Sequence, residues 1–143
     1  MAKRSELVKQ FFLYLKDSGM KIETVDASYG VYVFEYRSVD LYVFTDMDDD
    51  VITLYFKYLM RGMPSDREFN FNQMLKILPD GYEDYDIELL PYGDCYMSRQ
   101  WRFGIDNNAA LDVLFKKMLE EMFSAVVGLI SAIRRTEKKY GYY

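Results

Sequence analysis

The chain has 143 residues, and half of them are hydrophobic, which suits one domain with a substantial core. Its formal net charge of −5 argues against a nucleic-acid partner, because such proteins need a basic face to neutralise phosphates. The single cysteine, Cys95, excludes an internal disulfide framework and suits a reducing compartment.

No segment of the sequence resembles a membrane helix or a secretory signal. The longest uncharged apolar run in the C-terminal half, residues 122–133, is shorter than the ~20 residues that a membrane helix needs. The N-terminus, MAKRSELVKQFF, lacks an uninterrupted apolar region and a small-residue cleavage site. We therefore expect a cytoplasmic protein that does not insert into membranes.

The first half of the chain predicts one helix and a three-stranded meander. The helix is capped by Ser5 and runs to about Asp17, with Gly19 as its stop signal. A short extended piece follows at residues 22–25. Three segments rich in β-branched and aromatic residues, separated by short polar turns, then predict antiparallel strands at residues 31–37, 41–45 and 51–60.

The second half predicts a short helix, a hairpin and a long helix. The short helix covers about residues 67–78. Two strands follow at 87–92 and 95–103, and Gly93 and Asp94 between them predict a two-residue hairpin turn.

The long helix begins at Asp106 or Asn107, either of which can cap it, and runs to about Lys138. Because strands joined by tight turns are antiparallel, the whole order predicts an α+β fold with one antiparallel sheet, made of the meander and the hairpin, and helices on one face. We expect a single domain over residues 1–143, with the order α-β-β-β-α-β-β-α.

Five stretches carry a resemblance to a known family. They are the opening amphipathic helix with its glycine stop (7–19), the aromatic meander (31–60), the short helix with Asn72 and Leu75 (69–78), the hairpin IELLPYGDCYM and the closing helix NNAALDVLFKKMLEEMF. Together they resemble the YbjN-type family of bacterial proteins and the type III secretion chaperone-like fold. The resemblance implies a small cytoplasmic protein, commonly dimeric, that acts as a secretion chaperone or a regulator, and it supplies no catalytic residues.

An acidic stretch, TDMDDD, places Asp46, Asp48 and Asp50 at positions one, three and five of a calcium loop. Such a loop also needs glycine at position six and a bidentate glutamate at position twelve, where this sequence has Val51 and Lys57. The flanking segments are predicted strands, whereas the calcium loop joins helices. We therefore interpret the stretch as a solvated hairpin turn and expect no metal site.

The sequence offers little for catalysis. The absence of histidine excludes a Ser–His–Asp triad and a Cys–His pair. Cys95 follows Asp94, whose carboxylate raises the pKa of the thiol, the wrong direction for a nucleophile. We expect a protein that is not an enzyme and has no cofactor; an enzyme that uses carboxylates such as Asp94 or Glu35 is an alternative.

Both faces of the predicted meander carry large apolar side chains. Tyr32, Phe34 and Tyr36 share one face of the first strand, and Tyr55 lies in the third strand. Helices in so short a chain can cover only one face, so the other should meet solvent or a partner. The alternative is a tyrosine-rich surface that is exposed to solvent and binds no partner.

The last helix has an apolar stripe that is wider than one sheet contact needs. Its outer part either lies in the core or buries against a second copy, and we expect a homodimer. The candidate partner-binding residues are Tyr32, Phe34, Tyr36, Tyr55, Phe123 and Val127.

These patterns predict a non-catalytic binding module, chaperone-like or regulatory. An aromatic sheet face or an open strand edge would take up an extended or helical segment of a partner protein. A regulatory protein whose apolar surface serves only its own dimer is the alternative.

Overall fold

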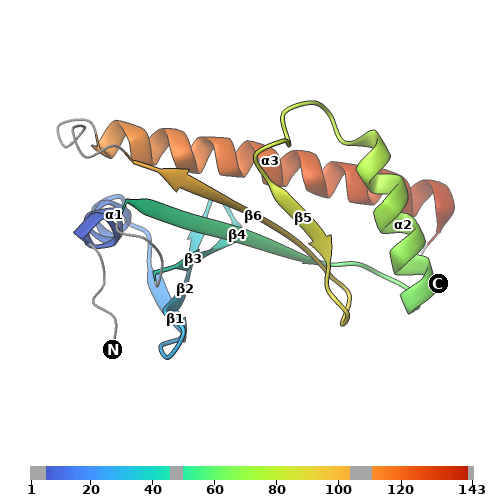
Figure 1. The fold of residues 1–143 in the computed structure, drawn as a ribbon, viewed down its shortest axis with the longest axis horizontal. Helices are drawn as coiled ribbons and strands as arrows, with labels where there is room; N and C mark the ends of the chain where they lie inside the picture. The colour runs from blue at the N-terminus through green and yellow to red at the C-terminus, as the bar shows by residue number, and fades with distance from the viewer. Residues whose placement is uncertain (1–5, 46–49, 104–110, 142–143) are drawn as a thin grey trace. The chain divides into compact units, whose positions relative to one another are not determined.

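The computed structural model describes residues 6–45, 50–103 and 111–141. The elements, labelled in Figure 1, are α1 (Glu6–Asp17), β1 (Ile22–Asp26), β2 (Val31–Tyr36), β3 (Val39–Phe44), β4 (Val51–Leu59), α2 (Pro64–Ile77), β5 (Asp86–Leu89), β6 (Asp94–Arg102) and α3 (Leu111–Tyr140). The strands form one six-stranded antiparallel sheet in the order β1-β2-β3-β4-β6-β5, with three helices packed on it. This arrangement confirms the predicted α+β class. Among the described residues no helix is long and apolar enough to cross a membrane.

The extended piece predicted at residues 22–25 is a full strand, β1, so the sheet has one strand more than expected. β1 pairs with β2 at one edge of the sheet. Its residues Glu23 to Val25 are all exposed, and Ile22 is half-buried. A strand that buries so little has no apolar alternation in its sequence, which is why the pattern predicted only an extended piece.

The predicted two-residue turn at Gly93 and Asp94 is wrong. The N–H of Leu90 donates to the carbonyl of Asp94 at 2.8 Å, so the loop between β5 and β6 has three residues, Pro91 to Gly93. Pro91 has no N–H to continue the ladder, and Gly93 takes a φ of +108° at the end of the loop. A three-residue loop that ends on a left-handed glycine is a common hairpin connection.

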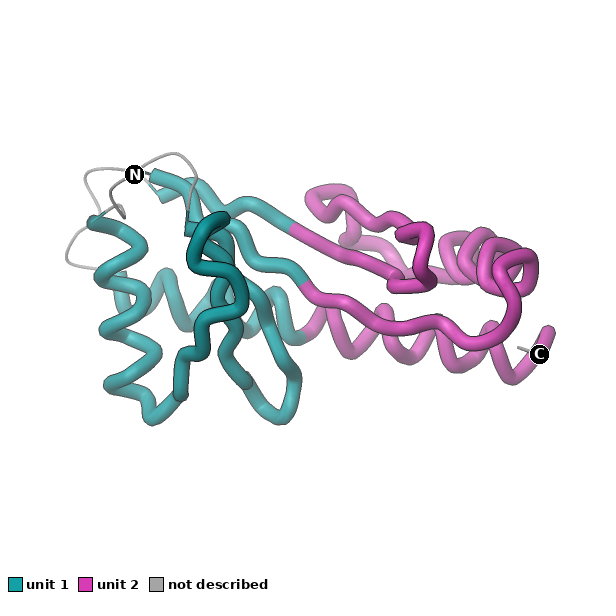
Figure 2. The backbone as a smooth tube through the Cα atoms, turned by 90° about the horizontal axis from the view of Figure 1, so that it is seen from below, with its two compact units in different colours: residues 1–55, 99–123 teal, residues 56–98, 124–143 magenta. Residues whose placement is uncertain are grey.

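The chain forms two compact units, coloured teal and magenta in Figure 2. Unit 1 consists of residues 1–55 and 99–123, and unit 2 consists of residues 56–98 and 124–143. The chain passes from one unit to the other inside β4, β6 and α3, without a separate linker. The single domain over residues 1–143 stays a prediction.

Unit 1 has an aromatic core. The ring of Phe11, on α1, lies 5.8 Å from that of Phe34 on β2 and 5.2 Å from that of Phe115 on α3, measured between centroids. Phe103, after β6, lies 5.5 Å from Phe115. All four rings are buried, and such tilted and edge-on pairs are worth about 0.5–1.5 kcal/mol each beyond the area that they bury.

Helix α1 ends where the sequence predicts. Gly19 has a φ of +83°, its N–H donates to the carbonyl of Lys16, and the N–H of Met20 donates to the carbonyl of Leu15, both at 2.9 Å. These two bonds satisfy carbonyls of the last helical turn that would otherwise have no partner within the helix.

Unit 2 is packed mainly by sulfur-containing and aliphatic side chains. The fully buried ones are Met60, Met74, Cys95, Met97, Val126, Leu129 and Ile133. Methionine is unbranched and polarizable, so it fills irregular space between a sheet and two helices.

A glycine in α3 lets the loop before β5 approach the helix closely. The hydroxyl of Tyr82 donates to the carbonyl of Ala125 at 2.6 Å. A Cβ atom on Gly128 would overlap that hydroxyl oxygen. Burial, and then the nearby Tyr85, raise the pKa of Tyr82.

We expect Gly128→Ala to destabilise the protein by about 1–3 kcal/mol, because the methyl group displaces Tyr82 and breaks the part-buried hydrogen bond of its hydroxyl. Helix propensity alone predicts the opposite sign, since alanine is favoured over glycine by about 1 kcal/mol. Urea unfolding followed by circular dichroism measures the difference.

Ser131→Ala, at an exposed position of the same helix, is the matched control and should change the free energy of unfolding by less than about 0.5 kcal/mol. Adding Tyr82→Phe to Gly128→Ala should recover part of the loss, because the ring carbon that bears the hydroxyl is 3.5 Å from the added Cβ. A Gly128→Ala protein that is more stable than wild type would contradict the close approach.

Candidate functional site

The helices of unit 1 cover the sheet face that carries Tyr32, Phe34 and Tyr36. Tyr32 lies 5.2 Å from the ring of Phe12 on α1, and Tyr36 lies 5.8 Å from the ring of Phe123 on α3. Phe34 is only 1% exposed and belongs to the core. Of the candidate partner-binding residues, Tyr36 and Phe123 therefore meet each other, whereas Phe34 has no surface to offer a partner in this conformation.

The opposite face of β2 and β3 is more accessible. The strand register places Val33 and Tyr42 as a cross-strand pair on it, next to the exposed pair Glu35 and Asp40. Tyr55, another candidate, lies on this face but is buried, with its ring stacked on Tyr42 at 4.8 Å and 11°. The accessible aromatic face of unit 1 is thus the one that carries Tyr42.

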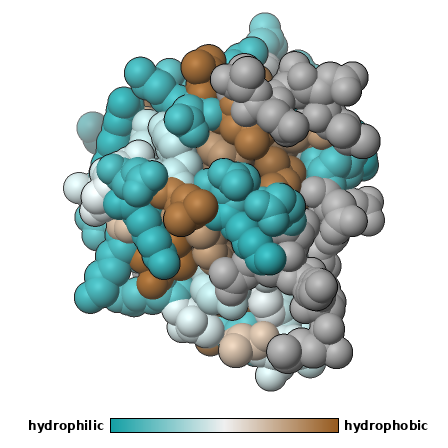
Figure 3. All heavy atoms as spheres, turned by 90° about the vertical axis from the view of Figure 1, so that its left-hand side faces the viewer, coloured by the Kyte–Doolittle hydropathy of each residue, from teal (hydrophilic) through white to brown (hydrophobic). Residues whose placement is uncertain are grey.

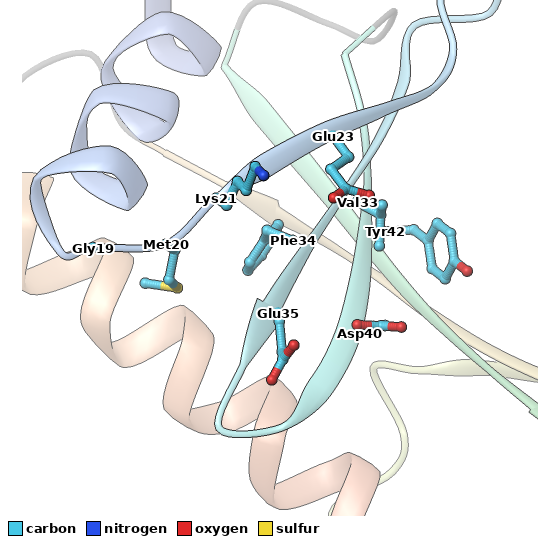
Figure 4. Close-up of a pocket in the computed structure, with 9 residues that line it drawn as sticks. All are labelled: Gly19, Met20, Lys21, Glu23, Val33, Phe34, Glu35, Asp40 and Tyr42. Carbon is cyan, nitrogen blue, oxygen red and sulfur yellow. The ribbon is translucent and has the colours of Figure 1, made fainter.

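A step in the sheet creates a cavity on this side of unit 1. β1 begins at Ile22, opposite Phe34, while β2 and β3 extend beyond this point for two further pairs, Glu35 with Asp40 and Tyr36 with Val39. A cavity of about 510 Å³, which we call the notch, lies at this step (Figure 4). Its lining residues are Gly19, Met20, Lys21, Glu23, Val33, Phe34, Glu35, Asp40 and Tyr42.

The notch has more negative than positive charge. Glu23, Glu35 and Asp40 contribute carboxylates, and Lys21 contributes one ammonium group. Figure 4 shows Glu35 and Asp40 projecting from neighbouring strands, and they are direct cross-strand partners, an arrangement that costs stability between like charges. The described residues contain no group of three or more side chains that could hold a metal ion. The excess of carboxylates over ammonium groups favours a positively charged group at the notch.

The backbone of Glu35 faces the β1 side of β2. Tyr36 and Val39 flank a two-residue turn, and in such a hairpin this flanking pair exchanges both of its hydrogen bonds. The preceding pair, Glu35 and Asp40, then points its N–H and C=O groups away from the partner strand. On β2 this direction is the β1 side, where Lys21 is the next residue in register after the pair Ile22 and Phe34.

The turn beside the notch has an unusual backbone. Arg37 and Ser38 have φ values of 50° and 68°, a region that favours glycine and asparagine. The guanidinium of Arg37 lies 5.1 Å from the ring centroid of Tyr36 and 5.4 Å from that of Phe123. Cation–π contacts of this kind offset part of the strain. The sequence analysis selected Tyr36 and Phe123 as candidates but missed Arg37. Its position could have been recognised, because it is a basic residue in a two-residue turn after an aromatic strand.

The outer stripe of α3 is mostly covered within the chain. Leu119 is buried, Phe123 and Ile130 are half-buried, and Val127 is 45% exposed. Val127 is in unit 2 and Phe123 in unit 1, so these two candidates are assigned to different units.

Exposed aliphatic side chains of unit 1 come from several elements. Leu13 of α1, Val25 of β1 and Val113 of α3 are all exposed. Figure 3, seen from the α1 end, shows apolar groups at the surface between hydrophilic ones.

The acidic stretch joins β3 to β4, which are antiparallel neighbours, as a hairpin turn requires. Asp46 and Asp48 lie outside the described residues, as do the predicted helix caps Asp106 and Asn107. Both carboxylate oxygens of Asp50 accept hydrogen bonds from Arg102 at 2.9 Å.

Cys95 is a core residue of unit 2. Its side chain is completely buried, and this burial, followed by the charge of Asp94, raises the pKa of the thiol to about 12. Asp94 has the predicted effect, but burial is the larger cause.

No family model and no curated protein matches this sequence. Its fold is similar to that in a crystal structure of an uncharacterized protein from Methanothermobacter thermautotrophicus, with a TM-score of 0.64 and 14% sequence identity. The match covers 94% of this chain and 99% of the other. At this identity the likeness establishes the fold alone, and membership of the YbjN-type family stays a prediction.

We expect Cys95 in the folded protein to react with iodoacetamide at about pH 7.5 far more slowly than a free thiol, because alkylation needs an accessible thiolate. Mass spectrometry of the alkylated chain measures the rate, and the urea-unfolded protein is the control. Alkylation of the folded protein at the free-thiol rate would overturn the assignment of Cys95 to the core.

The raised pKa also fixes the sign of a pH dependence. The unfolded thiol loses its proton near its ordinary pKa of about 8.5, while the folded thiol keeps it to about 12. The contribution of Cys95 to stability is therefore complete below about pH 8.5 and falls above it, by up to about 1.4 kcal/mol per pH unit. Cys95→Ala should remove this part of the alkaline loss.

Proposed function

We propose that this protein is a non-catalytic binding module, chaperone-like or regulatory, that takes up an extended segment of a partner protein at the notch. The observation that supports it best is the notch, a cavity of about 510 Å³ beside the cross-strand pairs Val33–Tyr42 and Glu35–Asp40. An extended segment that took the place of Lys21 beside β2 would pair with the N–H and C=O of Glu35.

The lining of the notch favours a particular kind of segment. Val33 and the ring of Tyr42 offer apolar contact to one side chain of an added strand. Glu35 and Asp40 favour a lysine or arginine at a neighbouring position, because a cation relieves the repulsion between them. Backbone pairing would supply affinity, and these side chains would supply selectivity.

Glu35→Pro tests this function with little effect on the fold. Proline removes the N–H that faces the notch, and the pairing of β2 with β3 loses no hydrogen bond because Glu35 does not bond to β3. We expect capture of the partner from a lysate of the native host, quantified by mass spectrometry, to fall about 10-fold, as the loss of about 1.4 kcal/mol of binding implies.

Asp17→Lys, at an exposed position outside the notch, is the control, and we expect it to capture as much partner as wild type does. A proline at this position would instead disrupt α1. Equal capture by wild type and Glu35→Pro, with unchanged melting temperatures, would rule out strand addition at the notch.

Self-association is a second candidate function, favoured by exposed apolar side chains of unit 2. Phe69, Ile77 and Tyr140 are 48%, 42% and 44% exposed, and the rings of Phe69 and Tyr140 lie 5.1 Å apart. Burying such a patch in a symmetric pair is the commonest route to a soluble assembly. We propose a homodimer that uses this surface.

Light scattering at micromolar concentration should therefore give a mass near twice the 17.0 kDa of one chain. Phe69→Asp with Ile77→Asp should give a folded monomer, because a charge in a buried apolar interface is strongly unfavourable. Val127→Asp, on the exposed part of α3, is the control and should leave the dimer intact. A wild-type mass near 17.0 kDa would end this proposal, and a monomer from Val127→Asp would move the interface to α3.

A further inference from the structure

Strand β5, in unit 2, is the outermost strand at the other edge of the described sheet. The N–H of Leu90 donates to the carbonyl of Asp94 at 2.8 Å, which sets the alternation of the ladder. Counting back by two, Glu88 and Asp86 direct their backbone groups toward β6. Ile87 and Leu89 direct theirs outward, where a further strand could pair with them.

A groove of about 470 Å³ lies between α2 and this edge. Phe71 of α2 and Ile87, Leu89 and Leu90 of the hairpin belong to its apolar lining, and its polar lining is Arg67, Glu68, Asn72 and Glu88. Leu75, one helical turn after Phe71, continues this line on α2 and is 40% exposed. Apolar side chains of an added strand would therefore find partners on the α2 side of the sheet.

Arg67 closes one end of the groove. Its guanidinium lies against the hairpin loop, 2.9 Å from the position that a Cβ atom on Gly93 would occupy. The loop glycine thus leaves room for the arginine, which lines the groove where α2 approaches the β5–β6 hairpin.

The other side of the same edge is acidic. Residues 78–97 contain six carboxylates and neither lysine nor arginine, although the whole chain has a net charge of only −5. Two of these carboxylates, Asp86 and Glu88, are exposed on β5 and project from the sheet face opposite to Ile87 and Leu89. Side chains of an added strand that alternate away from the groove would lie beside them.

We propose that the β5 edge and the α2 groove bind an extended segment of a partner protein in which apolar residues alternate with lysine or arginine. The apolar residues enter the groove, the basic ones face Asp86 and Glu88, and the backbone pairs with Ile87 and Leu89. This surface is separate from the notch, and the proposal does not depend on it.

Charge complementarity also selects against a second copy of this chain at the same edge. If two β5 strands paired, Asp86 and Glu88 of one copy would lie beside the same residues of the other, and like charges at neighbouring strand positions are unfavourable. The edge therefore resists its own copies while it stays open to a basic strand.

The test uses the full chain and three fluorescein-labelled peptides of about ten residues. In the first, valine and lysine alternate; the second has the same composition with the lysines grouped together; in the third, valine and glutamate alternate. We expect fluorescence anisotropy to show binding of the first, about 10-fold weaker binding of the second, and no binding of the third.

The double variant Asp86→Lys with Glu88→Lys should reverse the preference, so that the alternating glutamate peptide binds and the alternating lysine peptide does not. Asp80→Lys with Glu83→Lys makes the same change in net charge at exposed positions outside the strand, and it should keep the wild-type preference. Circular dichroism checks that both variants are folded.

Three results would overturn the proposal. Equal binding of the alternating and grouped lysine peptides would mean charge attraction without strand addition. Loss of lysine-peptide binding in Glu35→Pro would assign the peptide to the notch. A dimer that dissociates on charge reversal of β5 would mean that a second copy occupies the edge. If wild type and Glu35→Pro capture the partner equally while the alternating lysine peptide still binds at β5, the proposed function at the notch fails and the proposal for the β5 edge stands.

Discussion

The ring contact between Phe11 of α1 and Phe115 of α3 is the constraint on which the rest of unit 1 depends. Their centroids are 5.2 Å apart, and Phe34 of β2 packs against Phe11 at 5.8 Å. This cluster places both helices on the Phe34 side of β2, whereas on the other side Tyr42 stacks on Tyr55 of the neighbouring strand. The packing that stabilises unit 1 therefore also determines where a ligand can approach its sheet.

The sequence was sufficient to predict those elements whose conformation is determined by their own residues. Gly19 ends α1 through its positive φ, and the apolar run VITLYF forms a strand that is buried on both faces. It could not show which face of the meander the helices cover, because Val31 and Val33 alternate with Tyr32 and Phe34 and both pairs are apolar. That choice is made by Phe11 and Phe115, which are distant in the sequence. The notch was missed for a related reason, since it arises where β1 begins and neighbouring strands extend beyond it.

The two units are stabilised differently. Unit 1 is locked by rings whose geometry is specific, whereas unit 2 buries Met60, Met74 and Met97, which repack at low energetic cost. The hydroxyl of Tyr82, hydrogen-bonded to the carbonyl of Ala125, leaves no space for a methyl group on Gly128. Unit 2 is thus the better suited of the two to adjust its groove to different side chains.

Both edges of the sheet have features that limit uncontrolled pairing. β1 has a register shift between Thr24 and Asp26, and β5 is four residues long with exposed carboxylates at Asp86 and Glu88. A bulge and a short acidic strand reject most strands, including those of identical chains, but neither removes the outward N–H and C=O groups. A strand that pairs at either edge must complement it in charge and length. The bulge of β1 and the carboxylates of β5 therefore make each edge selective for the strands that can pair with it.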